Sequence, residues 1–123
     1  MKLEDFSVVG FSGSRSVVPD CLEAVCKKID NQKVFVGDAK GVDAAVRDFF
    51  PDAVVFKVKF PKKGGFAERS IRFVDAVASN QGCLISFPDK ACPVGLIPAN
   101  KSKAFKGSGS GSWATLSYAA WLN

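Results

Sequence analysis

Residues 6–15, which read FSVVGFSGSR, indicate the class of fold. Residues 6–11 form a short apolar run bounded by a Ser/Gly loop, and this pattern predicts a buried strand. Pro19 and Asp20 follow the loop, and a proline at the first helical position is typical of a helix start. A strand, a Gly/Ser loop and a helix in this order are typical of the first unit of an α/β domain.

Strand and helix continue to alternate along the chain. Apolar runs predict further strands over residues 33–36, 53–60 and 83–87. Helical spacing predicts that the first helix ends at Asn31 and that others span residues 42–50, 66–80 and 112–122. In residues 53–60 the apolar side chains alternate with Lys57 and Lys59, which indicates a strand at the sheet edge. Right-handed crossovers with the first strand central then give a Rossmann-like three-layer sandwich with a mainly parallel sheet in the order 3-2-1-4.

The composition is that of one globular domain spanning residues 1–123, with a long loop insert at about residues 88–110. The chain is 47% apolar and 24% charged, which argues against disorder and coiled coil. No apolar run reaches the length of a membrane span, and residues 1–5 are too acidic and too short for a signal peptide. Four cysteines without a CxxC pair favour free thiols in a reducing compartment. We therefore expect a cytoplasmic protein with no membrane partner.

The charged residues exclude some functions and favour others. The chain has no histidine, which excludes Ser-His-Asp and Cys-His nucleophiles and His-ligated zinc. Its net charge of +5 favours an anionic partner, although ordinary solubility charge explains it as well. Single-stranded DNA is compatible with this charge but is not favoured, because no basic stripe is interleaved with aromatic residues. We expect no cofactor and no metal.

Gly/Ser-rich loops are predicted to meet at one place in this fold. In open α/β sheets, ligands bind beyond the carboxyl ends of the strands, where the strand order switches. The switch here lies between the first and fourth strands. The loops that reach it are residues 12–16 and 88–112, and the loop of residues 37–41 is their neighbour. The sequence therefore predicts a ligand site at this edge.

Two of these loops carry residues suited to phosphate. Small residues let backbone N–H groups approach an anion at a helix N-terminus, and an arginine can bind phosphate through two hydrogen bonds. A plain linker and a strand-to-helix turn with a solvent-facing arginine are the alternatives. The candidate residues are Ser12, Gly13, Ser14 and Arg15 in the first loop, and Ser108, Gly109, Ser110, Gly111 and Ser112 before the last helix.

Other polar residues have two interpretations each. Asp38 and Asp43 flank the loop after the second strand, where they would either cap the following helix or accept hydrogen bonds from a ribose. Arg69 and Arg72 share a helix face, which is solvated or, for Arg69, close to the site. Trp113 belongs to the core or stacks on a base at the pocket mouth.

Taken together, these motifs resemble the SLOG superfamily over residues 6–120. They are Gly-Ser-Arg at 13–15, GDAKGVD at 37–43, Ala-Glu-Arg-Ser at 67–70 and GSGSW at 109–113. The superfamily includes cytokinin-activating phosphoribohydrolases and the DNA-processing protein of natural transformation, and the chain is most similar to its small single-domain bacterial and phage branch. The resemblance implies a site for a nucleotide or an ADP-ribose-like ligand, formed by Gly13, Ser14, Arg15, Gly37, Gly41, Asp43, Arg69, Gly109, Gly111 and Ser112.

One departure from the family pattern bears on catalysis. Thr115 stands where the phosphoribohydrolases carry a catalytic glutamate, and a hydroxyl cannot replace a carboxylate that stabilises cationic charge. We therefore expect a non-catalytic or weakly catalytic binder that acts as a sensor or a sequestering protein. The alternatives are an N-glycosidic hydrolase using Asp43, Glu68 or Asp89, and a single-stranded DNA-binding module.

Self-association is the other expectation. The residues of the last predicted helix, 112–122, are apolar on more than one face, with Trp113, Leu116, Tyr118, Trp121 and Leu122 among them. One such face covers the sheet, and the other would be left exposed on a monomer. Relatives in this superfamily often dimerise through helices beside the site. We therefore expect a homodimer or a higher oligomer.

Overall fold

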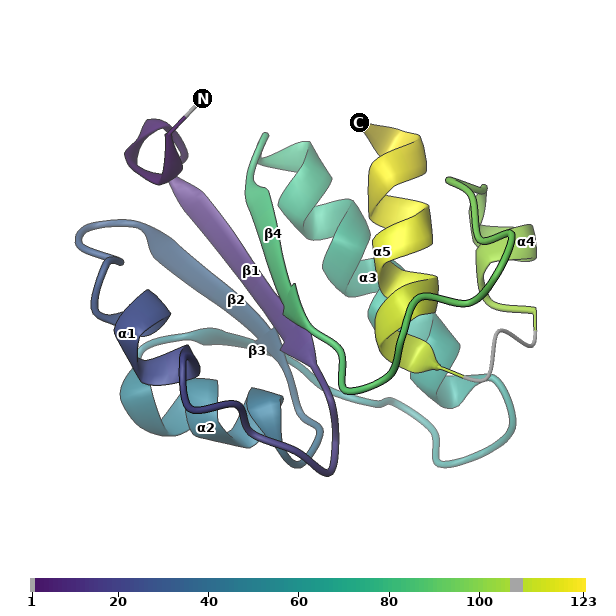
Figure 1. Ribbon diagram of the computed structural model, residues 1–123, viewed down its shortest axis with the longest axis horizontal. Coiled ribbons are helices and arrows are strands. Elements are labelled where there is room, and N and C mark those ends of the chain that lie inside the picture. The colour runs from purple at the N-terminus through teal and green to yellow at the C-terminus, as the bar shows by residue number, and fades with distance from the viewer. Residues whose placement is uncertain (1, 107–109) are drawn as a thin grey trace.

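A four-stranded parallel sheet forms the centre of the protein (Figure 1). The computed structural model describes residues 2–106 and 110–123. The strands are β1 (Val8–Gly13), β2 (Lys33–Gly37), β3 (Val54–Phe56) and β4 (Cys83–Phe87), and their order is β3-β2-β1-β4. This order confirms the predicted α/β topology with β1 central.

Helices cover both faces of the sheet. α1 (Leu22–Cys26) and α2 (Val42–Phe49) lie on one face, and α3 (Gly65–Ser79) and α5 (Gly111–Leu122) lie on the other (Figure 1). The short helix α4 (Lys101–Ala104) packs beside α5, and a 3-10 turn, η1 (Leu3–Asp5), precedes β1. None of the helices in the described residues has the length and apolar character needed to cross a membrane.

Alternating side chains of β1 divide the core into two halves. Val9 and Phe11 are fully buried and pack with Val36, Val42 and Val46 toward α1 and α2. Val8 points the other way, into the cluster beneath α3 and α5. This division follows from the twofold periodicity of a strand that is covered on both faces.

A glycine in β1 lets α3 approach the sheet closely. A Cβ atom at Gly10 would lie 2.7 Å from Val77 Cγ2 and 3.0 Å from Phe73 Cζ, both of which belong to α3. These contacts are closer than side chains tolerate, so glycine at this position sets the spacing between helix and sheet.

The third strand is much shorter than the prediction of residues 53–60. Its pairing with β2 ends at Phe56 because side chains bind the backbone groups that come next. Arg72 Nη2 donates to the carbonyl oxygen of Lys57 at 2.6 Å, and Asp38 Oδ2 accepts from the N–H of Val58 at 2.9 Å. The predicted edge position is confirmed.

Three other segments differ from the sequence prediction by more than one residue. β1 begins at Val8 and continues to Gly13, because Ser12 and Gly13 still pair with β4. α1 covers only Leu22–Cys26, and tighter turns follow it, in which Ile29 N–H donates to Cys26 O at 3.1 Å. The segment over residues 88–110, predicted to lack regular structure, contains α4, whose start is capped by Asn100.

A buried phenol provides a test of packing between α3 and α5. Tyr118 Oη donates to Asp75 Oδ1 at 2.5 Å, and burial, together with Asp75, raises the pKa of Tyr118 to about 12 from its ordinary value of 10.0. The folded state therefore favours the neutral phenol, so the contribution of this tyrosine to stability is present below pH 10 and is lost as the pH rises toward 12.

We expect the ultraviolet absorbance of tyrosinate to develop in the folded protein only near pH 12. Tyr118 is the only tyrosine of the chain, so the signal comes from one group. Asp75→Asn is the matched variant, and because it removes the adjacent charge it should lower the midpoint. A wild-type midpoint at the ordinary value would contradict the buried contact.

Candidate ligand-binding site

A cavity of about 500 Å³ opens at the carboxyl edge of the sheet. Its walls come from the loops after β1 and β2, from residues 89–90 after β4, and from the N-terminal turns of α3 and α5. β1 lies between β2 and β4, so the cavity sits at the switch in strand order where the sequence placed the site. The three predicted loops do converge.

The cavity brings together most of the predicted site residues. Asp38, Gly41 and Trp113 lie outside its lining, and Ser108 and Gly109 fall outside the described residues. The predicted residues that do line the cavity are Ser12, Gly13, Ser14, Arg15, Gly37, Asp43, Arg69, Ser110, Gly111 and Ser112.

The loop after β1 is fixed by Ser14. Its hydroxyl oxygen accepts from the N–H of Ser16 at 3.0 Å and of Val17 at 2.9 Å, and its own N–H donates to Phe87 O at 3.0 Å. This serine turn holds the loop in one conformation and joins it to the end of β4. Ser14 therefore shapes the cavity wall through its backbone contacts.

Arg15 leaves this turn with its charge uncompensated by acidic groups. The guanidinium carbon lies 4.2 Å from the centre of the Phe66 ring, a cation–π contact that holds the side chain at the cavity wall. Among the ion pairs of the described residues, none involves Arg15. This guanidinium can therefore form hydrogen bonds with an anion that enters the cavity.

Arg69 is held very differently. Only 8% of the residue is exposed, and its Nη1 lies 2.7 Å from Asp38 Oδ1 and 3.9 Å from Asp43 Oδ2. A Cβ atom at Gly37 would lie 2.6 Å from both Arg69 Nη1 and Asp43 Oδ2, so glycine is needed for this approach. The predicted arginine of the third helix therefore lines the cavity as part of a nearly buried ion cluster.

Helix capping, the alternative considered for Asp38 and Asp43, is wrong for both. Gly41 is the N-cap of α2, and no side chain caps this helix end. Asp38 instead binds Arg69 and the N–H of Val58, while Asp43 accepts from the N–H of Ala39 at 3.2 Å. Gly41 supports the first loop, since its Cβ would lie 2.3 Å from Ser14 O and its φ is +69°.

Burial makes the carboxyl group of Asp43 a weaker acid than an exposed aspartate. Desolvation raises the pKa of its carboxyl group, and the Ala39 N–H and the nearby Arg69 and Arg47 charges offset this only in part. A carboxyl group with a raised pKa in a cavity wall is a candidate for proton transfer. Glu68, by contrast, lies outside the lining, and its hydrogen bond with Arg72 lowers its pKa.

The start of α5 forms another wall of the cavity. Ser110 caps the helix by accepting from the N–H of Trp113 at 3.4 Å, and Gly111 and Ser112 form the first turn beside the cavity.

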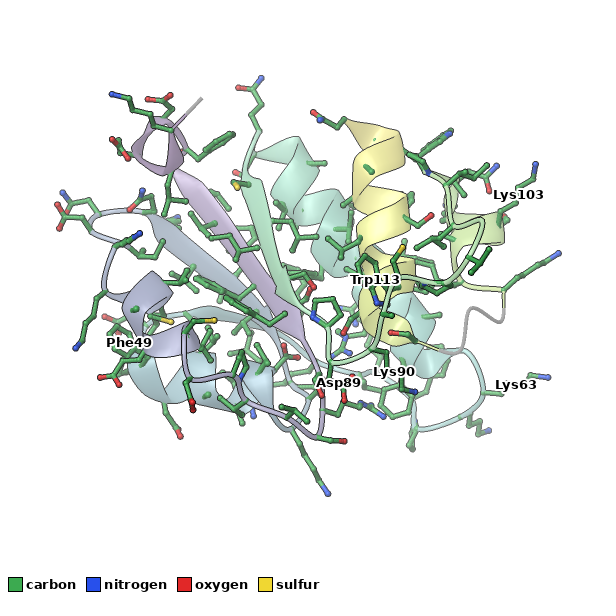
Figure 2. All side chains as sticks on the ribbon, in the orientation of Figure 1. Phe49, Lys63, Asp89, Lys90, Lys103 and Trp113 are labelled. Atoms are coloured by element: carbon green, nitrogen blue, oxygen red, sulfur yellow. The ribbon has the colours of Figure 1, made fainter. Side chains whose placement is uncertain are left out.

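Trp113 neither joins the core nor lines the cavity. Its Nε1 donates to Lys90 O at 2.8 Å, which joins the loop after β4 to α5 (Figure 2). Thr115 faces the cavity, and its hydroxyl donates to Gly111 O at 2.8 Å.

Four phenylalanines line the cavity, and none was singled out as a site residue from the sequence: Phe11 and Phe73 belong to the core, and Phe66 and Phe105 lie outside it. Phe66 is the second residue of α3 and has 51% of its surface exposed, and Phe105 follows α4. The chain contains 11 phenylalanines, so residue type alone gives no reason to choose these two. The one available signal in the sequence is that Phe66 directly follows the loop predicted over residues 61–65 and so stands at a predicted helix start.

No family model, curated protein or solved structure matches the chain. The SLOG resemblance therefore remains a prediction, and the function is argued from the cavity.

The ion cluster predicts that Arg69→Ala destabilises the protein. Removing the guanidinium leaves Asp43 buried without its opposite charge, and breaking such a pair costs about 3 kcal/mol, since Asp38 keeps some contact with solvent. Urea unfolding measures the change. Lys27→Ala is the control, because its pair with Glu23 is exposed and is expected to contribute no more than ~0.5 kcal/mol. Equal losses in the two variants would show that the cluster is not a structural centre.

Proposed function

We propose that this protein binds a nucleotide-derived small molecule, of the nucleoside phosphate or ADP-ribose type, and acts as a sensor or a sequestering protein. The observation that carries the proposal is that one cavity is lined by the N-termini of two helices, α3 and α5, and by Arg15, which forms none of the ion pairs of the described residues. These groups are suited to a phosphate, and the remaining walls are suited to a base and a sugar.

The anionic part of the ligand is assigned to the walls formed by Arg15, α3 and α5. The N-terminal turns of both helices line the cavity, through Phe66 and Ala67 in α3 and Gly111 and Ser112 in α5. A helix N-terminus presents unpaired N–H groups and a partial positive charge to an anion. The Arg15 guanidinium adds a full positive charge with planar, paired donors.

The base is assigned to the aromatic part of the lining. Phe66 and Phe105 contribute rings to the cavity wall, and Phe66 is already stacked against a planar guanidinium. A planar heterocycle packs favourably on such rings. The volume of about 500 Å³ lies within the usual range for small-molecule sites. Asp43 supplies a buried acceptor, or a donor when protonated, for a sugar hydroxyl group.

One observation supports hydrolysis of an N-glycosidic bond as the second candidate function. Asp43 lines the cavity, and its raised pKa suits a general acid. Against this, Thr115 presents a hydroxyl in the lining where the resemblance requires a carboxylate. We therefore favour binding without turnover.

A second copy of the chain and a cytoplasmic location complete the proposal. In the last turn of α5, Trp121 is 51% exposed and Leu122 is 37% exposed. This exposed apolar surface is smaller than the sequence of the helix predicts, because other apolar residues of α5 pack against α3, α4 and the sheet. The four cysteines are free thiols, as suits a reducing compartment where nucleotides are abundant.

Loss of the Arg15 guanidinium should weaken binding without unfolding the protein. A charge-assisted hydrogen bond is worth about 1.5–3 kcal/mol, so we expect Arg15→Ala to raise the Kd for ADP-ribose or AMP roughly ten- to a hundredfold. Isothermal titration calorimetry measures this change. Lys63→Ala removes the same charge from an exposed loop outside the cavity lining and should leave the Kd unchanged (Figure 2).

Two results would overturn the proposal. The first is that wild-type protein binds neither ADP-ribose nor AMP at millimolar concentration. The second is that a folded Arg15→Ala variant binds as tightly as wild type, which would place the phosphate elsewhere.

Incubation with AMP separates binding from hydrolysis. We expect no free base above the buffer blank, because losing one preorganised electrostatic group lowers turnover by about 10²–10³ and Thr115 provides no carboxylate. Chromatographic quantification of adenine is the measurement. Turnover that disappears in Asp43→Asn would instead establish the hydrolase and identify its carboxyl group.

A further inference from the structure

The outer edge of β4 has no strand beside it. β4 lies at the end of the sheet, and β1 is its one neighbouring strand among the described residues (Figure 1). The carbonyl oxygen of Phe87 accepts from Ser14 N–H at 3.0 Å and so points toward β1. Backbone groups alternate in direction along a strand, so the N–H and C=O groups of Leu84 and Ser86 point outward. Within the described residues, their one partner is the Cys83 thiol, 4.0 Å from Leu84 O.

The opposite edge of the sheet shows how an exposed strand is usually protected. Natural proteins shorten edge strands, place lysines on them or divert their backbone groups, which prevents pairing with other chains. β3 has only three residues, Lys57 and Lys59 follow it, and the side chain of Arg72 binds the outward carbonyl oxygen of Lys57. The β3 edge is therefore closed to pairing.

β4 has none of these protections. It is five residues long, reads CLISF and contains neither a charge nor a proline. All of its side chains are only partly buried, among them Leu84, Ile85 and Phe87. An uncharged, apolar edge with unpaired backbone groups is suited to adding another strand.

We propose that the partner is a second copy of this chain, whose β4 pairs antiparallel with the first across a twofold axis. Ile85 lies on the axis, and Leu84 of each copy faces Ser86 of the other. The outward N–H and C=O groups of both residues are then all paired, because each facing pair exchanges two hydrogen bonds. The sheet continues through both copies, and the contact is self-complementary, as twofold interfaces are.

Charge and proline positions favour this register. The paired segment, Cys83–Phe87, contains no charged residue, so no like charges meet within it. A shift that placed Leu84 opposite Pro88 would lose a hydrogen bond, because proline has no N–H.

The paired strand, Cys83–Phe87, contributes no residue to the cavity lining, and the interface goes beyond the proposed ligand binding. It also differs from a dimer through α5, whose exposed apolar residues lie on another surface. The two interfaces can be distinguished by cross-linking, and neither outcome depends on a nucleotide.

Disulfide cross-linking tests the register directly. In a full-length variant with Cys21, Cys26, Cys83 and Cys92 replaced by alanine or serine, Ile85→Cys places two thiols across the axis. Facing residues of this kind have Cα atoms about 4.5 Å apart, which is within disulfide range. After mild oxidation at micromolar concentration, we expect most of the protein to run as a dimer on a non-reducing gel.

Two control variants make the outcome specific. Leu84→Cys changes a neighbour that is off the axis and on the other face of the sheet, so we expect severalfold less dimer. Trp121→Cys reports on an α5 interface. Efficient cross-linking of Trp121→Cys without Ile85→Cys, or equal yields from residues 84 and 85, would overturn the proposal.

A second measurement does not depend on the cysteine background. Ser86→Pro removes one outward N–H group and leaves the groups that face β1 intact, and proline is tolerated on edge strands. With circular dichroism confirming the fold, we expect light scattering to show a dimer for wild type and a monomer for Ser86→Pro. A monomeric wild-type protein at every concentration, or a Ser86→Pro dimer as stable as wild type, contradicts pairing along β4.

Discussion

The parallel pairing of β1 with a neighbour on each side is the constraint from which the cavity follows. The chain leaves β1 toward α1 on one face of the sheet and leaves β4 toward α5 on the other. Because the two connections diverge, neither fills the space beyond the carboxyl ends of these strands. Gly13 lets β1 pack closely against β4 and α2 at this edge, since its Cβ would lie 2.8 Å from both Phe87 O and Val42 Cγ2.

The charges around the cavity are arranged unequally. Arg69 is committed to Asp38 and Asp43, and this cluster organises the loop after β2. The Arg15 guanidinium lies over the Phe66 ring and takes part in none of the ion pairs of the described residues, so its positive charge is not neutralised by them. Two helix N-termini add partial positive charge on the same side. The result is a small cavity with a positively charged wall, an aromatic wall and one buried carboxyl group, and this combination is the basis for proposing a phosphorylated nucleoside as the ligand.

The sequence predicted the strand order and the loops of the site, because buried strands, Gly/Ser loops and amphipathic helices each leave a local pattern. It did not predict the early end of β3, which depends on Asp38 and Arg72 binding the backbone of residues 57–58. It likewise could not reveal that Arg69 is neutralised while Arg15 is not, since both are arginines near a helix or loop start. Phe66, Phe105 and the unprotected edge of β4 became visible only when distant segments were placed side by side.

The most direct test of the cavity as the binding site is a map of backbone amide chemical-shift changes in ¹⁵N-labelled protein during titration with ADP-ribose. We expect the largest changes at residues 13–16 after β1 and residues 110–112 at the start of α5, with smaller changes near Phe66. Shifts that saturate elsewhere, such as the groove formed by Val18, Leu22 and Phe49 between α1 and α2, while these amides remain unchanged, would contradict the assignment of the cavity as the binding site.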